Sequence, residues 1–501
     1  MSASPSYVFG PRDRRGFLLG LRGGQVAIAS VGLLTALGLV MATGASLAAL
    51  ILVVVVLGVT ATAVLFPVGG RGADEWLVGL VRFLGAGPRE WRSPLPHSGR
   101  LLVRDHRGRA LAVLPAQPAF PPVLNDCLLL SVAVPRGQLG VIHDRRRGTY
   151  TAVIRVRDRD DGSSSFGLLD NQTKASRMAG WGAALISLAQ LGSPVQAVQL
   201  VVRTVPADAA GLAHYLSERR VADVRSPILR SYLSLLDDAV QVTQAQQVYI
   251  AVQIGAAQAR RAIREAGGGD AGAGALLADQ VDAFQRQLAG VDIGVDGALP
   301  PRLLARVLRE AWDPAAAPLL QLDPAGLDPA GAGPLMTTRS WRSYGSDAGS
   351  QSVSWWVSDW PRSPVGADFL LPLLLGTEAR MSFSLTLQPV DGIRARRDLE
   401  AAQTEHLADE QLRVRHGFRT SVDRQRQAAA VERREAELAD GHADCRFSGH
   451  ITVSAGSDEE LQRACDEVTR KATAAGLDLR RMDGEHDLGF SYTLPLARGL
   501  W

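Results

Sequence analysis

Side chains that could act as metal ligands lie close together in one short segment near the carboxyl end of the chain. His442, Cys445 and His450 fall within residues 442–450, HADCRFSGH. Imidazole and thiolate groups are zinc ligands, but a structural zinc site uses four ligands, arranged as pairs with short spacings. No second pair of this kind accompanies the segment. We therefore expect no metal site and no metal cofactor.

The lysines of the chain bear on nucleotide chemistry. A phosphate-binding loop has the pattern G-x-x-x-x-G-K-[ST], because its lysine reaches the β- and γ-phosphates and its hydroxyl binds Mg²⁺. The only lysines are Lys174 and Lys471, and neither stands in that pattern. The glycine-rich stretch Gly267–Gly274 is expected to be a flexible loop. We expect no ATP hydrolysis and no nucleotide cofactor.

The sequence also lacks the motifs of a hydrolase. The nucleophile elbow G-x-S-x-G is absent from the sequence. His143 and Asp144 are adjacent at an expected hairpin turn, where an aspartate usually bonds the local backbone. The carboxylate pairs at 237–238 and 459–460 fall on polar faces of expected helices. We therefore predict that the protein is not an enzyme and has no catalytic residues.

An uncharged stretch, residues 23–70, is the dominant element of the chain. No Lys, Arg, Asp, Glu or His lies between Arg22 and Arg71, and two apolar runs, 26–41 and 46–66, fill the stretch. A helix needs about 17–25 residues to cross a bilayer core about 30 Å thick. A buried pair of soluble helices is the alternative, but such helices usually keep a polar face. We expect a two-pass transmembrane hairpin.

Arginines on both flanks of this stretch predict its orientation. They are Arg12, Arg14, Arg15 and Arg22 before it, and Arg71, Arg82, Arg89 and Arg92 after it. Because positive residues stay on the cytoplasmic side, both termini of a multi-pass plasma (inner) membrane protein are expected in the cytoplasm. A cleaved signal peptide is the competing interpretation, but the apolar region is too long. The arginines of the tail, residues 1–22, either bind anionic lipid or only set the topology, and we favour topology.

A helix over 74–84, within an interfacial segment and linker at 71–99, is expected to lie on the cytoplasmic leaflet. Its apolar residues share one face with Trp76, a residue enriched at membrane interfaces. The alternative is an ordinary core helix. The expected membrane-interface residues are Arg12, Arg14, Arg15, Arg22, Arg71, Trp76 and Arg82.

The composition fits a cytoplasmic location for the rest of the chain. Three cysteines, an odd number, lie far apart in sequence and suit a reducing compartment. The formal net charge of +3 is too small to indicate nucleic-acid binding. Arginine replaces lysine almost everywhere, and Ala and Gly are abundant, which is typical of a GC-rich, actinobacterial genome.

Residues beyond the linker alternate between strand and helix patterns. We expect a membrane-anchored α+β protein with two α/β-sandwich lobes of split βαβ type. Lobe 1 covers 100–312, an inter-lobe loop 313–350, and lobe 2 351–501, which includes a long charged helix at 391–440. The expected strands are 127–134, 139–143, 149–156, 195–205, 247–254, 351–360, 380–389, 450–454 and 489–494. The expected helices are 170–191, 207–220, 226–240, 274–288, 301–312, 365–375 and 458–475.

Aromatic residues are concentrated in Trp341–Pro361, WRSYGSDAGSQSVSWWVSDWP. Trp and Tyr are favoured both in cores and at binding hot spots. These side chains therefore either pack between the lobes, or form a docking surface for another subunit. The candidate docking residues are Trp341, Tyr344, Trp355, Trp356 and Trp360.

Three short strings carry a resemblance to a known family. They are LGVIHDRRRGTYTAVIRV at 139–156, QVYIAVQI at 247–254 and WWVSDWPRSPVGADFLLPLLL at 355–375. In this order they resemble the region that precedes the motor of the conjugation ATPases of type IV secretion, joined here to a two-pass anchor. The topology and first hairpin also resemble the EccE components of actinobacterial type VII secretion. The sequence departs from the ATPase family because it lacks the phosphate-binding loop motif of the motor.

The resemblance implies a non-catalytic, membrane-anchored component of a secretion or conjugation apparatus that docks a separate P-loop ATPase. Its expected partners are the lipid bilayer, that ATPase and other membrane subunits, in an oligomeric assembly without specific nucleic acid. The alternatives are a DNA- or lipid-binding factor of a conjugative element, and an enzyme acting on membrane-associated substrates. Salt-sensitive retention of DNA would favour the DNA-binding alternative.

Overall fold

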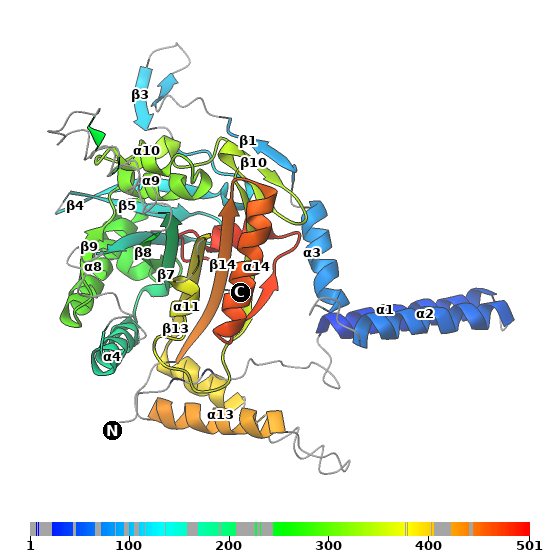
Figure 1. The fold of residues 1–501 in the computed structure, drawn as a ribbon. Helices are drawn as coiled ribbons and strands as arrows, with labels where there is room; N and C mark the ends of the chain where they lie inside the picture. Colours follow the sequence, from blue (N-terminus) through cyan, green and yellow to red (C-terminus); the bar gives the residue numbers. More distant parts are fainter. Residues whose placement is uncertain are drawn as a thin grey trace. The chain divides into compact units, whose positions relative to one another are not determined.

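The computed structural model of the protein consists of two compact units (Figure 1). One unit contains residues 1–11, 89–482 and 486–501, and the other contains residues 12–88 and 483–485. The structure describes residues 23–43, 47–65, 72–85, 87–94, 100–104, 110–115, 117–135, 137–157, 169–188, 192–206, 244–375, 379–401, 422–439 and 444–500, with the single residues 7, 9, 190, 226, 227, 231, 377, 403 and 404.

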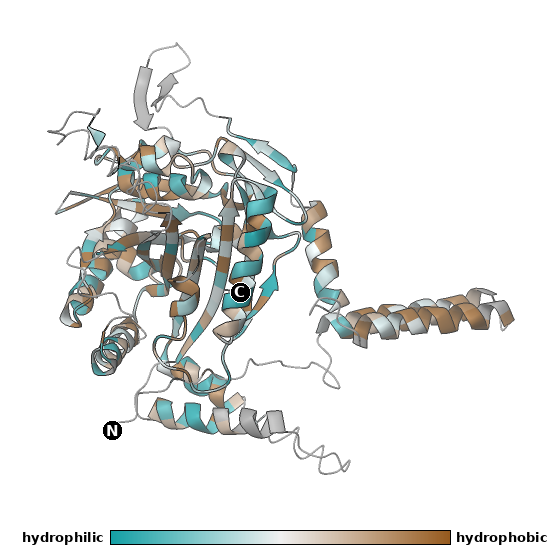
Figure 2. Ribbon diagram, in the orientation of Figure 1, coloured by the Kyte–Doolittle hydropathy of each residue, from teal (hydrophilic) through white to brown (hydrophobic). Residues whose placement is uncertain are grey.

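The smaller unit is built from three helices, α1 (Gly23–Thr43), α2 (Leu47–Leu65) and α3 (Ala73–Gly85). Apolar residues dominate α1 and α2 (Figure 2). These two helices pack antiparallel, because Gln25 near the start of α1 donates a hydrogen bond to the carbonyl oxygen of Val64 near the end of α2, 2.9 Å away. In the described part of the chain, one helix, 23–42, is long and apolar enough to cross a membrane, and 50–64 is a shorter apolar helix.

The larger unit contains a sheet whose first half has a split β-α-β-β-α-β connection. The elements in chain order are β6 (Thr149–Val156), α4 (Asn171–Leu188), β7 (Val195–Pro206), β8 (Gln244–Gly255), α8 (Gly269–Gly290) and β9 (Val295–Ala298). The spatial order is β9-β6-β8-β7, with every pair antiparallel. The strands β5 (Gly137–Asp144) and β4 (Cys127–Val134) extend this half to the edge of the sheet.

The second half repeats the same connection. Its elements are β12 (Gln351–Asp359), α11 (Leu371–Leu374), β13 (Arg380–Val390), α13 (Val422–Ala439), β14 (Asp444–Ala455), α14 (Asp458–Ala474) and β15 (Asp478–Arg481). Their spatial order, β15-β12-β14-β13, matches that of the first half, again with antiparallel pairs. The halves meet where β13 pairs with β7, with Leu385 opposite Leu200.

The mixed α+β class is therefore confirmed, but the expected division into two lobes is not. Strands from both expected lobes belong to one 13-stranded sheet, because β7 of the first half pairs directly with β13 of the second half. The expected inter-lobe loop, 313–350, instead contains α10 (Ala317–Gln321), β10 (Met336–Arg339), β11 (Tyr344–Gly345) and the 3₁₀ turns Pro329–Gly331 and Asp347–Gly349.

Several local expectations also change. Residues 85–99, expected as a linker, contain β1 (Glu90–Arg92), which pairs with β10. The segment expected as a last strand, 489–494, lies largely in helix α15 (His486–Tyr492), and α11 covers only part of the helix expected at 365–375. Of the charged helix expected at 391–440, the structure describes helical residues at 392–401 and α13. The helices expected at 207–220 and 226–240 lie outside the described residues, apart from residues 226, 227 and 231.

The remaining elements are a second sheet and short helices. β2 (Arg100–Arg104) and β3 (Ala110–Pro115) form a two-stranded sheet. The 3₁₀ turn Pro122–Leu124 precedes β4, α7 (Arg260–Glu265) precedes α8, and α9 (Pro301–Trp312) follows β9. The entry of α9 has a proline at its first position, where a missing N–H donor costs little.

Three hydrophobic cores cover the two faces of the large sheet. Helices α4 and α8 cover one face of the first half, and α14 covers one face of the second half. On the other face, α9 packs on the first half together with the carboxyl-terminal segment, residues 486–500. Under that segment the strands of the second half carry polar residues, among them Ser354, Ser384 and Thr452, which are all buried. These hydroxyl groups bond to one another or to the segment's backbone, so the segment is held by hydrogen bonds as well as by apolar contact.

Candidate functional site

The aromatic residues of 341–361 do not form one surface. Tyr344 is 1% exposed and packs against Trp312 and Phe490, with ring centroids 5.9 and 5.5 Å away. Trp355 is 4% exposed and lies in the core beneath α14, because alternate residues of β12 face opposite sides of the sheet. The docking interpretation is therefore wrong for Tyr344 and Trp355, whose rings are not accessible to a partner.

The other members of this set are half-buried. Trp341 lies in the bend between β10 and β11. Trp356 donates a hydrogen bond from Nε1 to Ser448 Oγ, 3.1 Å away, and the guanidinium of Arg480 lies 5.8 Å from its ring. These two tryptophans, with Trp360, remain the candidates for docking.

Trp360 binds the amino-terminal tail of the chain itself. Phe9 stacks on Trp360 with ring centroids 5.1 Å apart and also contacts Phe369 and Phe447. Two residues earlier, Tyr7 exchanges both backbone hydrogen bonds with Val365, at 2.9 and 3.0 Å. At residues 7 and 9 the tail is therefore docked against the larger unit. The tail sequence contains no regular pattern that predicts this contact.

The expected membrane-interface residues are only partly described. Arg12, Arg14, Arg15, Arg22 and Arg71 lie outside the described residues. Trp76, half-buried, and Arg82, exposed, both lie on α3, so the helix expected at 74–84 is confirmed. Its apolar side chains are more than two-fifths exposed at Leu77, Val78, Leu80, Val81 and Leu84.

The residues considered for catalysis have structural partners. Asp144 Oδ1 accepts a hydrogen bond from the backbone N–H of Arg147, 3.0 Å away, which confirms the turn interpretation. His143 stacks on Tyr150 and places Nδ1 3.2 Å from Asp270, not beside Asp144. His442 lies outside the described residues, and the described residues contain no group of three His, Cys, Asp or Glu side chains that could hold a metal ion.

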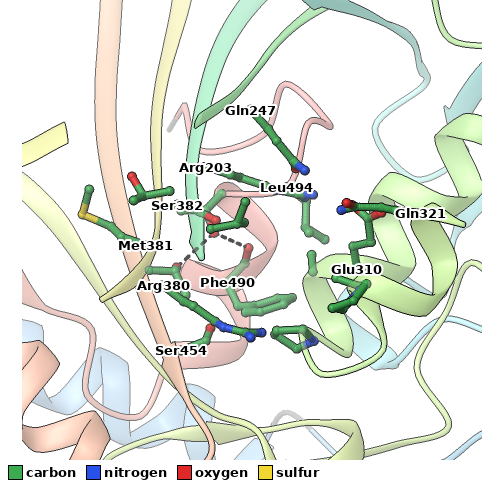
Figure 3. Close-up of a pocket in the computed structure, with 18 residues that line it drawn as sticks. Arg203, Gln247, Glu310, Gln321, Arg380, Met381, Ser382, Ser454, Phe490 and Leu494 are labelled. Atoms are coloured by element: carbon green, nitrogen blue, oxygen red, sulfur yellow. Dashed lines mark hydrogen bonds between the residues drawn. The ribbon is translucent and has the colours of Figure 1, made fainter. Parts of the chain in front are cut away.

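A cavity of about 110 Å³ lies between the ends of β7, β13 and β14 and the helices α9 and α10 (Figure 3). Arg203 and Arg380 enter it from neighbouring strands, while Glu310 and Gln321 line it from the helices. Phe490 and Leu494, from the carboxyl-terminal segment, add apolar wall. The sequence analysis did not single out these residues, because they come from five separate elements.

The charges in this cavity are strongly desolvated. Arg203 is 4% exposed, and its burial lowers the pKa of its guanidinium. Burial also lowers the pKa of Arg380, although the carboxylate of Glu460 opposes the shift. Burial raises the pKa of Glu310, which the guanidinium groups of Arg203 and Arg306 lower in turn. Arginines therefore outnumber carboxylates around the cavity.

No family model matches the sequence, and no curated protein matches it significantly. The resemblance to conjugation ATPases and to EccE rests on the residues quoted above and stays a prediction.

Proposed function

We propose that the protein is a membrane-anchored, non-catalytic component of a bacterial secretion or conjugation apparatus that docks a separate P-loop ATPase. The observation that carries the anchor is the apolar exterior of the paired helices α1 and α2. Met41, near the end of α1, and Leu47, at the start of α2, are 80% and 77% exposed. Apolar surface of this extent is unfavourable in water at about 25 cal/mol per Å² and suits a bilayer.

In this proposal α1 and α2 form a two-pass hairpin. The antiparallel pairing places Gln25 and Val64 at one end of the pair and Thr43 and Leu47 at the other. The flanking arginines keep the open end of the hairpin, and hence the large α+β unit, in the cytoplasm. The docking role is supported by the resemblance to the secretion proteins. It is also supported by the half-buried docking candidates Trp356, on β12, and Trp341, before β12.

The anchor is tested with a single cysteine introduced at position 45 and labelled in intact cells with a membrane-impermeant maleimide. The connector is expected to be labelled from outside, while a matched cysteine at position 87, after α3, is labelled only after lysis. Extraction of the full chain by alkaline carbonate, or labelling of position 87 in intact cells, would overturn the two-pass topology.

The docking role is tested by cross-linking in native membranes, detergent extraction of the tagged full chain, and mass spectrometry. We expect a P-loop ATPase to co-purify, and Trp356→Ala to weaken its recovery by about 30-fold, the effect typical of an interfacial tryptophan. Trp181→Ala is the matched control, since Trp181 is also half-buried but lies on α4. The absence of any P-loop ATPase from the cross-linked material would contradict the proposal.

A further inference from the structure

The cavity between β7, β13 and α9 contains two guanidinium groups that lack sufficient protein partners. Arg203 Nη1 donates to the carbonyl oxygen of Val307, 2.8 Å away, but among the described residues Nε and Nη2 have no hydrogen-bond partner. Arg203 is only 4% exposed, so solvent does not replace these missing partners. A buried N–H group without an acceptor costs roughly 1–3 kcal/mol, so these donors would be stabilised by an acceptor that the described residues do not supply.

The register of β13 against β7 places Arg380 close to Arg203. Ser382 on β13 is paired with Arg203 on β7, so Arg380, two residues earlier, is the diagonal neighbour of Arg203 on the same face. Diagonal neighbours on adjacent strands are within reach of long side chains. In the described part of the structure Arg380 has no ion pair within 4 Å. The carboxylate of Glu460 acts on Arg380 and that of Glu310 acts on Arg203, whereas an anion bound between the two guanidinium groups would interact with both of them.

The carboxylate of Glu310 does not serve as that anion. Its nearest ion-pair contact is Arg306, with Nε 3.8 Å from Oε1, and it forms no ion pair within 4 Å with Arg203 or Arg380. The cavity therefore retains excess positive charge beside an apolar wall formed by Phe490 and Leu494. Its volume of about 110 Å³ exceeds the roughly 30 Å³ that one water occupies in the liquid, and it opens to solvent.

We propose that this cavity is a binding site for a small oxyanion, a carboxylate or a phosphate group, held between Arg203 and Arg380. A guanidinium presents paired N–H donors that match two oxygens of a carboxylate or phosphate, and such charge-assisted bonds are the strongest polar contacts in proteins. The Nε and Nη2 groups of Arg203 are one such pair of donors. The ligand is either the side chain of an acidic residue from a binding partner or a free or substrate-borne phosphate, and both present the same oxygens.

The test uses the purified full chain in detergent, with thermal melting and calorimetric titration in sodium acetate, inorganic phosphate and sodium chloride at equal ionic strength. At least one oxyanion is expected to raise the melting temperature above the chloride value. A response to acetate identifies a carboxylate ligand, and a response to phosphate alone identifies a phosphate ligand. Equal melting temperatures in all three salts would overturn the proposal.

The variant Arg380→Gln separates binding from folding. Because Arg380 is half-buried and lacks an ion pair, we expect the variant to melt at or above the wild-type temperature in chloride, and to bind the oxyanion at least about ten-fold more weakly. Arg394→Gln is the matched control, since the Arg394 side chain is 79% exposed and, among the described residues, forms an ion pair with Asp391 at 3.6 Å. Equal oxyanion affinity in Arg380→Gln and Arg394→Gln would also overturn the proposal.

Discussion

Gln199 on β7 donates a hydrogen bond from Nε2 to Ser384 Oγ on β13, 2.9 Å away, across the seam where the two halves of the sheet meet. The same amide holds the carboxyl-terminal segment, since Nε2 also donates to Tyr492 O and Oε1 accepts from the N–H of Ala497, each at 2.7 Å. Gln199 is fully buried. One side chain therefore joins the first half, the second half and the end of the chain.

We expect Gln199→Leu to lower the free energy of unfolding by about 3 kcal/mol. Leucine has a similar size but leaves the N–H of Ala497 and the carbonyl of Tyr492 without this partner, and buried unsatisfied groups cost about 1–3 kcal/mol each. Urea unfolding of the detergent-solubilised full chain, followed by tryptophan fluorescence, measures the change. Gln258→Leu is the control, because exposed Gln258 makes one bond to Ser193 O. Equal losses in the two variants would contradict the assignment.

His450 makes the fold sensitive to acid. It is fully buried on β14, neither ring nitrogen has a hydrogen-bond partner among the described residues, and burial lowers its pKa to about 3. In the unfolded chain the imidazole of His450 binds a proton near pH 6.5. The stability that neutral His450 contributes to the fold is therefore complete above about pH 6.5 and is lost as the pH falls toward 3. The slope is up to about 1.4 kcal/mol per pH unit.

The variant His450→Leu removes this titration. Denaturant unfolding of both proteins at pH 7, 6, 5 and 4 should therefore show a difference in stability that shifts steadily in favour of the variant as the pH falls. Because every other titrating group is common to both proteins, the difference isolates His450. Two parallel stability profiles would contradict the assignment, because they would show that the pKa of His450 is the same in the folded and unfolded chain.

Local patterns were sufficient to predict most of the individual strands. The apolar run Cys127–Val134 predicted β4 with its observed bounds, and the expected hairpin turn at Asp144 ends in Gly148, with φ +63°. Gly148 adopts the left-handed region that favours glycine, so its position marks the turn. By contrast, GFSYTL at 489–494 alternates like a strand but lies largely in α15, where Phe490 packs against Trp312 and Tyr344.

Contacts between distant elements could not be predicted in this way. Nothing local to β7 or β13 indicates that they pair, since they are separated by more than one hundred residues and both are apolar on one face. In the sequence, polar positions such as Gln199 and Ser384 have the pattern of a strand face that is exposed to solvent. In the structure, the carboxyl-terminal segment covers both residues. The arginines of the cavity were missed for the same reason, because only pairing of β7 with β13 brings Arg203 and Arg380 together.

Docking of the tail is testable by a double-mutant cycle at Phe9 and Trp360. An aromatic pair contributes about 0.5–1.5 kcal/mol beyond area burial, so Phe9→Ala should raise the fraction of undocked tail about 2- to 12-fold. Trypsin cleavage at Arg12, Arg14 and Arg15, measured in the folded full chain, reports that fraction. Trp360→Ala should have a similar effect, and the double variant should add little. Strictly additive effects would mean that the two rings act independently.

Gly32 on α1 controls the approach of α1 to α2. A Cβ atom at this position would lie 2.3 Å from Thr60 Oγ1 and 2.5 Å from Thr60 Cγ2, closer than real side chains approach. The Thr60 hydroxyl is fixed by its bond to Val56 O, 2.7 Å away. Small residues allow such close packing between helices in a membrane, where van der Waals contact is a main source of association.

We expect Gly32→Ile to separate the paired helices, at a cost of about 1–3 kcal/mol for the added atoms. Cysteines placed at positions 25 and 64, where Gln25 bonds to Val64 O in the wild-type chain, should form a disulfide whose yield, measured by peptide mass spectrometry, falls at least about five-fold. Gly38→Ile is the control, because among the described residues no atom beyond its chain neighbours and the backbone of its own helix lies within 4 Å of the position of its Cβ. Both variants change helix propensity equally, so equal disulfide yields would show that the contact of Gly32 with Thr60 does not hold α1 against α2.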